Sequence, residues 1–132
     1  MTDNANEHVP SQAQRLVDAH HHFWALDGKV AYPWLEDSPV EDFFLGDYAA
    51  IRRPFLSTDL ERLVPAGFRL VGSVHCEAEA SRSQAATETR WITQQHATHG
   101  LPSAHVGWAA FGTDECAAQL DAQCESPLLR GI

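Results

Sequence analysis

The sequence predicts an α/β fold built on a parallel sheet. Segments rich in β-branched and aromatic residues alternate with segments of helical periodicity along the chain. The 132 residues are 44% hydrophobic and 20% charged, which is enough for one domain with its own core. Strands joined by helices form right-handed βαβ units, and these make parallel sheets. Doubly wound sheets and (β/α)₈ barrels share this order, so the order alone does not choose between them.

The strands and helices follow one another from residue 15 onward. Residues 1–14 are polar and are expected to form a disordered leader, and residues 15–132 are expected to form one domain. We expect strands over 15–24, 68–77 and 105–111 and from 128 to the end of the chain. We expect helices over 58–67, with Thr58 as its N-cap, and over 81–97, closed by Gly100.

Two further segments carry specific expectations. A helix after the N-cap Thr113 is expected to bury one face, formed by Cys116, Ala117, Leu120 and Cys124. Residues 25–56 form a long irregular stretch rich in proline, glycine and aromatic residues, with Tyr32-Pro33-Trp34-Leu35 at its centre. Such a stretch in a compact domain is typical of a lid or of a pocket wall.

Charge and cysteine content exclude several classes of protein. A formal net charge of −9 with only 9 Lys and Arg does not suit a protein that binds nucleic acid or anionic lipid. No secretory signal or membrane span is visible, so we expect a cytoplasmic protein with no membrane partner. The 3 cysteines have no CxxC spacing and are expected to be buried free thiols.

The pattern Asp18-x-His20-x-His22 is the strongest chemical signal. It lies at the end of the first expected strand, where alternate residues point to the same side, so His20 and His22 are expected to converge and His21 to point away. Neutral imidazole nitrogens are good ligands for zinc and similar divalent ions. The alternative is a chance polar run or a set of hydrogen-bonded core histidines.

Several short motifs in register resemble the amidohydrolase-related hydrolases, which include sugar-acid lactonases of the fuconolactonase type. The first motifs are 17–24 (VDAHHHFW) and 32–35 (YPWL), and the later ones are 74–79 (VHCEAE), 88–91 (ETRW), 106–109 (VGWA) and 129–132 (LRGI). Together they span about residues 15–132. The resemblance implies the N-terminal half, about four βα units, of a (β/α)₈ TIM barrel. It also implies a metal-dependent hydrolase acting on lactones of sugar acids or related carboxylates.

The resemblance places His20 and His22 at the first-strand metal pair, holding a divalent metal, zinc by preference, that polarises the scissile carbonyl. Some members of the family work without a metal, and these histidines would then contact the substrate. The substrate is expected to be a small molecule, and the oligomeric state stays open.

The second strand adds two polar candidates. Ser73, His75 and Glu77 share one strand parity and are expected to face the barrel interior, while Leu70, Val74 and Cys76 face the helices. Glu77 is a candidate catalytic or metal-binding residue, with a structural ion pair as the equal alternative. His75 is a candidate substrate contact, although a structural role is favoured.

Three aromatic residues of the long irregular stretch and its approach, Trp24, Tyr32 and Trp34, are candidates for a substrate pocket. Packing in the core is an equal alternative for all three. Trp91 and Trp108 are expected in the core. No GxSxG motif is present, and Cys76 is not marked as a nucleophile.

A complete barrel of this type needs about 250 residues, so the chain is expected to be truncated and inactive alone. Two alternatives remain: a non-enzymatic remnant, or a decarboxylase or amidase of the same superfamily.

Overall fold

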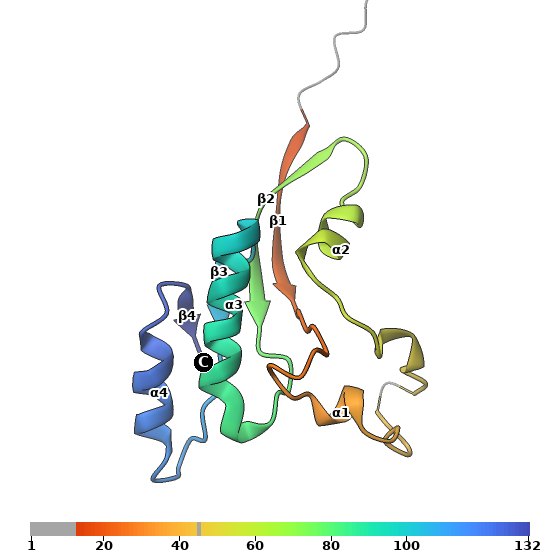
Figure 1. Cartoon of the computed structure of the whole chain (residues 1–132). Helices are drawn as coiled ribbons and strands as arrows, with labels where there is room; N and C mark the ends of the chain where they lie inside the picture. Colours follow the sequence, from red (N-terminus) through yellow and green to blue (C-terminus); the bar gives the residue numbers. More distant parts are fainter. Residues whose placement is uncertain (1–12, 45) are drawn as a thin grey trace, which may run out of the picture.

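The computed structural model describes residues 13–44 and 46–132 and shows an α/β arrangement around a four-stranded parallel sheet (Figure 1). The strands are β1 (Gln14–His21), β2 (Phe68–Cys76), β3 (Ala104–Val106) and β4 (Leu129–Gly131), in the spatial order β1-β2-β3-β4. The predicted parallel sheet and its strand order along the chain are therefore confirmed. Most of the predicted leader, 1–14, lies outside the described residues, but Gln14 already belongs to β1.

The helices connect successive strands. They are α1 (Pro33–Glu36), α2 (Ser57–Arg62), α3 (Ala85–His99) and α4 (Cys116–Cys124), with short 3₁₀ turns at Ala49–Ile51 and Arg82–Gln84. Helix α3 crosses in front of the strands in Figure 1, and α4 lies beside it. None of the described helices is long and apolar enough to cross a membrane.

The ends of α2 and α3 test the predicted caps. Gly100 ends α3 with φ 80°, the left-handed conformation that glycine adopts without a steric penalty, so this prediction is confirmed. The predicted N-cap at Thr58 is wrong, because α2 begins at Ser57. The N-cap is Leu56, and the carboxylate of Asp59 accepts its backbone N–H at 3.0 Å. This contact satisfies a backbone donor that has no partner within the helix.

The predicted apolar face of α4 is also wrong. Its buried residue is Gln123, while Ala117 and Cys124 are exposed. The Gln123 side chain donates to the Trp108 carbonyl at 2.8 Å and accepts from the Thr89 hydroxyl at 3.0 Å. Helix α4 is therefore anchored by a buried amide and not by an apolar stripe. Helix α4 begins at Cys116, so the predicted cap at Thr113 fails too.

The two faces of the sheet differ in what covers them. One face, here called the covered face, carries His21, Ser73, His75 and His105, all buried beneath the helices. The core continues from it through Phe23 and through residues of α2 and α3 (Leu60, Trp91 and Ile92). The opposite face, here called the open face, carries Val17, His20, Cys76 and Val106. Val17 is 59% exposed there.

Irregular pairing between β1 and β2 decides which residues reach which face. Leu16 pairs with Leu70, but the next residue, Val17, pairs with Gly72, so β2 holds one extra residue at this point. An extra residue reverses the alternation of the side chains beyond it. The predicted grouping of Ser73 with His75 is therefore confirmed, but the predicted faces are wrong beyond this bulge: His75 lies beneath the helices, and Cys76 faces the open side.

The three cysteines are free, as predicted. Cys124 is exposed, however, so the prediction that all three are buried is wrong. Residues 25–56 are mostly irregular apart from α1 and one 3₁₀ turn, and they wrap around the end of β1. This confirms the long irregular stretch and brings its aromatic residues to the carboxyl end of the sheet.

Candidate functional site

The imidazole rings of His20 and His22 converge at the carboxyl end of β1. Their Nε2 atoms lie 3.2 Å apart, so the expected convergence of the pair is observed. His20 is exposed, and the carboxylate of Asp18 accepts its backbone N–H at 2.9 Å. This contact is local and fixes the chain direction just before the pair.

The position of the ring proton of His22 follows from its backbone contacts. Its Nδ1 lies 3.0 Å from the carbonyl oxygen of Cys76 and 3.0 Å from that of Glu77. Carbonyl oxygens only accept, so Nδ1 carries the proton and Nε2 presents a lone pair. A metal-binding histidine is oriented in the same way, by a hydrogen bond from its other ring nitrogen.

The spacing of the two nitrogens fits one cation. Zinc–nitrogen bonds of about 2.0–2.1 Å at a tetrahedral angle place two ligand nitrogens about 3.3 Å apart, close to the 3.2 Å observed. Within residues 13–44 and 46–132, no cluster of three or more His, Cys, Asp or Glu side chains is arranged to hold a metal. The described part of the chain therefore offers two candidate ligands, and a metal held by them would need further ligands from water, substrate or other protein groups.

Glu77 follows β2 directly and lies beside the pair. Its Oε2 accepts the Glu79 backbone N–H at 2.9 Å and lies 3.6 Å from the Arg82 guanidinium. Arg82 also donates to Glu79 at 2.6 Å and stacks over the Trp108 ring at 4.4 Å. Glu77 is thus engaged in an ion pair at the mouth of the site, which was the alternative to a catalytic role.

Arg82 is a residue of the site that the sequence does not reveal. The residue precedes α3 and carries no motif, so only the fold shows that it reaches Glu77 and Trp108. Trp108, expected in the core, is only partly buried and forms part of a cavity wall.

His75 lies away from the open face. It is fully buried, and its Nδ1 lies 3.0 Å from Nδ1 of His105. Nε2 of His105 in turn lies 3.1 Å from the Thr89 hydroxyl of α3. Burial lowers the pKa of both histidines, that of His105 to about 4, because the interior disfavours the charged ring. The structure therefore places His75 in the core and not at the expected substrate contact. The reason is the bulge in β2, which turns the His75 side chain beneath the helices.

Tyr32 belongs to the core and not to a pocket. It is 1% exposed, and its hydroxyl donates to Glu88 at 3.2 Å. Glu88 also accepts the Ala78 backbone N–H at 3.0 Å. Burial raises the pKa of Glu88 to about 7 and raises that of Tyr32 as well. The Tyr32–Glu88 pair thus ties the irregular stretch to α3.

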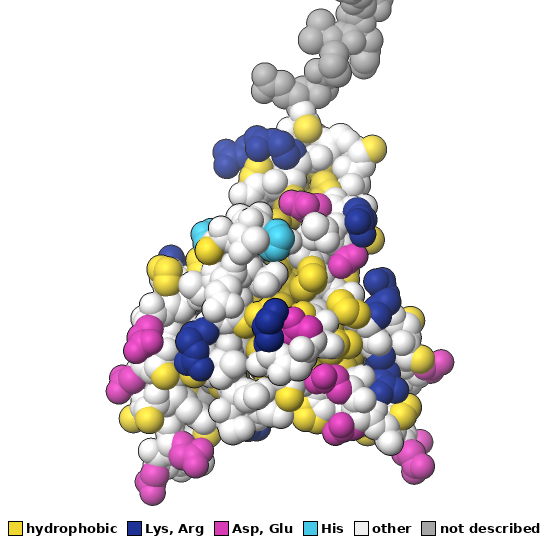
Figure 2. Space-filling view, in the orientation of Figure 1, with side chains coloured by type: hydrophobic (Ala, Val, Ile, Leu, Met, Phe, Trp, Pro, Cys, Tyr) yellow, Lys and Arg dark blue, Asp and Glu magenta, His cyan; other side chains and the backbone are white. Residues whose placement is uncertain are grey.

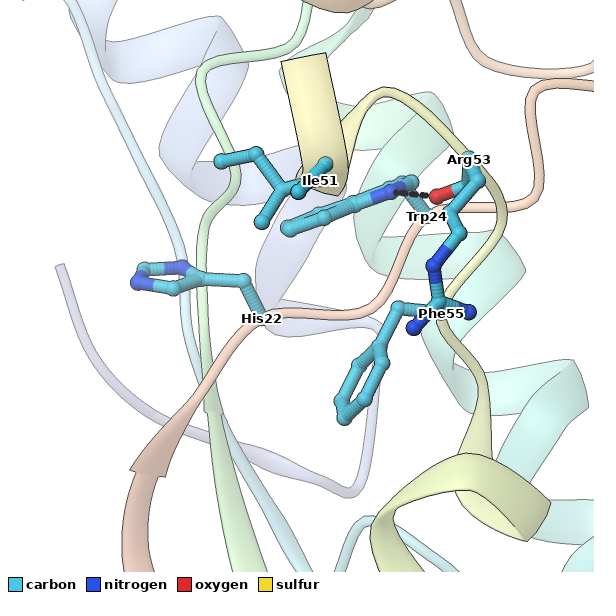
Figure 3. A pocket seen from close by; sticks show the side chains of 6 residues that line it. His22, Trp24, Ile51, Arg53 and Phe55 are labelled. Carbon is cyan, nitrogen blue, oxygen red and sulfur yellow. Dashed lines mark hydrogen bonds between the residues drawn. The ribbon is translucent and has the colours of Figure 1, made fainter. Parts of the chain in front are cut away.

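Trp24 and Trp34 do line cavities near the histidine pair. In Figure 3, the Trp24 ring lies beside Ile51 near His22, and its N–H points to the Arg53 carbonyl. Trp34 packs against Trp24 with ring centroids 5.8 Å apart. The predicted aromatic wall is therefore present for these two residues.

Two larger cavities meet at His22 and Glu77, which line both. The first, of about 370 Å³, lies over the open face, and the second, of about 500 Å³, is the aromatic pocket. The first cavity is lined by His20, His22, Cys76, Glu77, Val106, Gly107, Trp108, Ala109, Phe111 and Ile132. The aromatic pocket is lined by His22, Trp24, Trp34, Phe43, Phe44, Ile51, Glu77, Ala78 and Glu79.

Cys76 lines the first cavity but is not activated. The pKa of its thiol is raised, first by burial and then by the nearby carboxylates of Glu77 and Asp18. A thiol with a raised pKa holds little thiolate at neutral pH and is a weak nucleophile.

Over the side of the molecule that carries α3, Figure 2 shows dispersed Lys and Arg side chains and several acidic groups near the lower edge.

Comparison with known proteins gives one relative. The chain is 34% identical over 118 residues to the uncharacterized protein y4mH of Sinorhizobium fredii (strain NBRC 101917 / NGR234). The alignment covers 89% of this chain but 38% of that protein, so the chain spans well under half of the relative's length. No protein-family profile matches the chain, and no solved structure matches it.

Proposed function

We propose that the chain is the N-terminal part of a metal-dependent hydrolase with a barrel-like fold, acting on the carbonyl of a lactone or a related carboxylate ester. The observation that carries this proposal is the convergence of the His20 and His22 Nε2 atoms at 3.2 Å, with the proton of His22 held on Nδ1. Neutral nitrogens arranged in this way favour a zinc ion. A zinc ion bound there would polarise a carbonyl and lower the pKa of a bound water.

The topology supports the barrel part of this proposal. Strands in the order β1-β2-β3-β4 follow the chain without reversal, as in one sector of a (β/α)₈ barrel. A doubly wound sheet reverses its strand order at a switch point. The candidate site also lies at the carboxyl ends of the strands, where parallel barrels bind their substrates.

Residues of this chain have three roles at the proposed site. His20 and His22 would hold the metal, and the backbone carbonyls of Cys76 and Glu77 keep the ring of His22 in position. Glu77, held by Arg82, lies at the junction of the two cavities and would face a bound substrate.

We propose a cytoplasmic location for this protein, in keeping with its free thiols.

Zinc titration of the chain by calorimetry tests the metal pair. We expect binding of one zinc ion, weakened more than about tenfold by His20→Ala and by His22→Ala. The matched control is His99→Ala, because His99 is exposed at the end of α3 and should leave the affinity unchanged.

Equal zinc affinity in all four proteins would contradict the proposal and favour a remnant without metal chemistry. In a polypeptide that carries further strands after β4, the His20 and His22 substitutions should abolish zinc-dependent lactone hydrolysis. Release of carbon dioxide from a carboxylate substrate, with no lactonase activity, would instead favour the decarboxylase alternative.

A further inference from the structure

We infer that the aromatic pocket receives a flat, uncharged, apolar ring of the substrate, and not the polyhydroxylated ring of a sugar acid. This inference deepens the proposed function, because it assigns the part of the substrate that lies next to the scissile carbonyl. His22 belongs both to the candidate metal pair and to the wall of this pocket. His20 lines only the neighbouring cavity, so a carbonyl held between the two histidines on the His22 side would place its attached ring inside the pocket.

The size and walls of the pocket suit such a ring. The cavity measures about 500 Å³, within the range of about 300–1,000 Å³ that small-molecule sites occupy. Trp34 and Phe43 stack with their planes 14° apart, and Trp24 meets Trp34 edge-on at 75°. Offset-stacked and edge-to-face arrangements of this kind are those in which an aromatic ring packs favourably.

The walls offer few hydrogen bonds to a sugar. The Trp24 N–H donates to the Arg53 carbonyl at 2.6 Å, and the Trp34 N–H donates to the Ala78 carbonyl at 3.0 Å. Both indole donors are therefore occupied within the protein, and the two tryptophans present ring carbons to the cavity. A sugar hydroxyl that lies against these indole rings, away from the rim carboxylates of Glu77 and Glu79, would lose its hydrogen bonds to water without replacement.

The charges at the rim disfavour a carboxylate. Glu77 and Glu79 are the acidic groups of the pocket lining. Arg82, a cation beside these two carboxylates, is already paired with both, at 3.6 Å and 2.6 Å. A substrate carboxylate in the pocket would face two like charges, and like charges at close range repel. The ring that fits is therefore uncharged.

Phe44 provides a site for a clean test. Its side chain lines the pocket but is 84% exposed, so replacing it should not disturb the core. Phe68 is its matched control, since it is also exposed, at 41%, but lies at the opposite end of β2 from the site. Ile51→Asp supplies a second variant, which places a new carboxylate in the wall of the pocket.

Calorimetric titration of the chain with two probes tests the inference: dihydrocoumarin, an uncharged aryl lactone, and gluconolactone, a sugar-acid lactone. We expect dihydrocoumarin to bind at least about tenfold more tightly than gluconolactone. Phe44→Ser should weaken dihydrocoumarin binding about threefold to tenfold, and Ile51→Asp should weaken it further. Phe68→Ser should leave the affinity unchanged.

Two outcomes would overturn the inference. One is gluconolactone binding as tightly as dihydrocoumarin, and the other is an equal effect of the Phe44 and Phe68 substitutions. The result is separable from the zinc test. Dihydrocoumarin binding without zinc binding keeps the pocket assignment and removes the hydrolase proposal, whereas zinc binding with a preference for gluconolactone does the reverse.

Discussion

The covered face and the open face of the same sheet use histidine in opposite ways. On the covered face, His75 and His105 are fully buried, contact each other at 3.0 Å and have lowered pKa values. At the open face, His20 is exposed and its Nε2 meets that of His22 at the mouth of a cavity. Residue type alone therefore does not identify a candidate metal ligand. The deciding features are accessibility and a ring nitrogen that no backbone group occupies.

The difference also separates structural from functional roles. The contacts of His75 and His105 are completed by backbone and by Thr89, so these rings are saturated within the fold. The backbone contacts of His22 use only Nδ1, and its Nε2 is turned toward Nε2 of His20, 3.2 Å away. We expect substitutions on the covered face to change stability, and those around the His20–His22 pair to change binding.

The largest expected effect is loss of core packing on the covered side. Ile92 of α3 is fully buried, so Ile92→Ala should lower the free energy of unfolding by about 2–5 kcal/mol. Val17 on the open face is 59% exposed, and Val17→Ala should cost less than about 0.5 kcal/mol. Urea denaturation measures both. A similar loss in the two variants would mean that the open face is buried in solution, for instance against a second copy of the chain.

Acidification should weaken the covered face next. Burial lowers the folded pKa of His21 and of His105 from 6.5 to about 4, and that of His75 is lowered too. The unfolded chain therefore binds more protons below pH 6.5, so the stability that these neutral rings confer is present above pH 6.5 and is lost as the pH falls towards 4. Glu88 acts in the opposite direction, because its folded pKa is raised from 4.5 to about 7.

Three histidines opposed by one carboxyl leave a net uptake of about two protons on unfolding, or about 2.7 kcal/mol per pH unit. Glu88→Gln removes the opposing group and should make the loss of stability on acidification about one and a half times as steep. Urea denaturation at several pH values between 4.5 and 6.5 gives the slopes. His99→Gln, at an exposed position, is the control. A slope unaffected by Glu88→Gln would contradict the assignment.

A smaller effect distinguishes two glycines at the ends of adjacent strands. A Cβ added to Gly107 would lie 2.2 Å from Oε1 of Gln123, so the buried amide that anchors α4 has to move. Gly107→Ala should therefore cost about 1–3 kcal/mol. The Cβ of Gly131→Ala would meet its nearest neighbour, Val106, at 3.8 Å, an ordinary contact. Thermal unfolding of the two variants makes the comparison, and equal transition temperatures would show that Gln123 adjusts freely.

The smallest expected effect lies at the mouth of the site. The Arg82 side chain is 46% exposed, and its contacts with Glu77 and Trp108 are partly screened by water. Arg82→Ala should therefore cost less than about 1 kcal/mol. A double-mutant cycle with Glu77→Gln measures the coupling. A coupling above about 2 kcal/mol would show that the pair is much less exposed than it is in this structure.

Much of the fold was predictable from local patterns. The order of strands and helices, the parallel sheet and the end of α3 at Gly100 depend on periodicity and on backbone preferences, which are properties of short segments. The convergence of His20 and His22 was predictable as well, because the two are separated by one residue at a strand end.

The sequence by itself determined where each strand begins and that His20 and His22 lie side by side, although the predicted strands 15–24 and 105–111 end at His21 and Val106 in the structure. Only the tertiary structure decided which face His75 and Cys76 occupy, because the extra residue in β2 appears only when the strand pairs with β1. It also decided that Tyr32 reaches Glu88 and that Arg82 reaches Glu77. Side chains meet in these contacts across long stretches of sequence, so no local pattern records them.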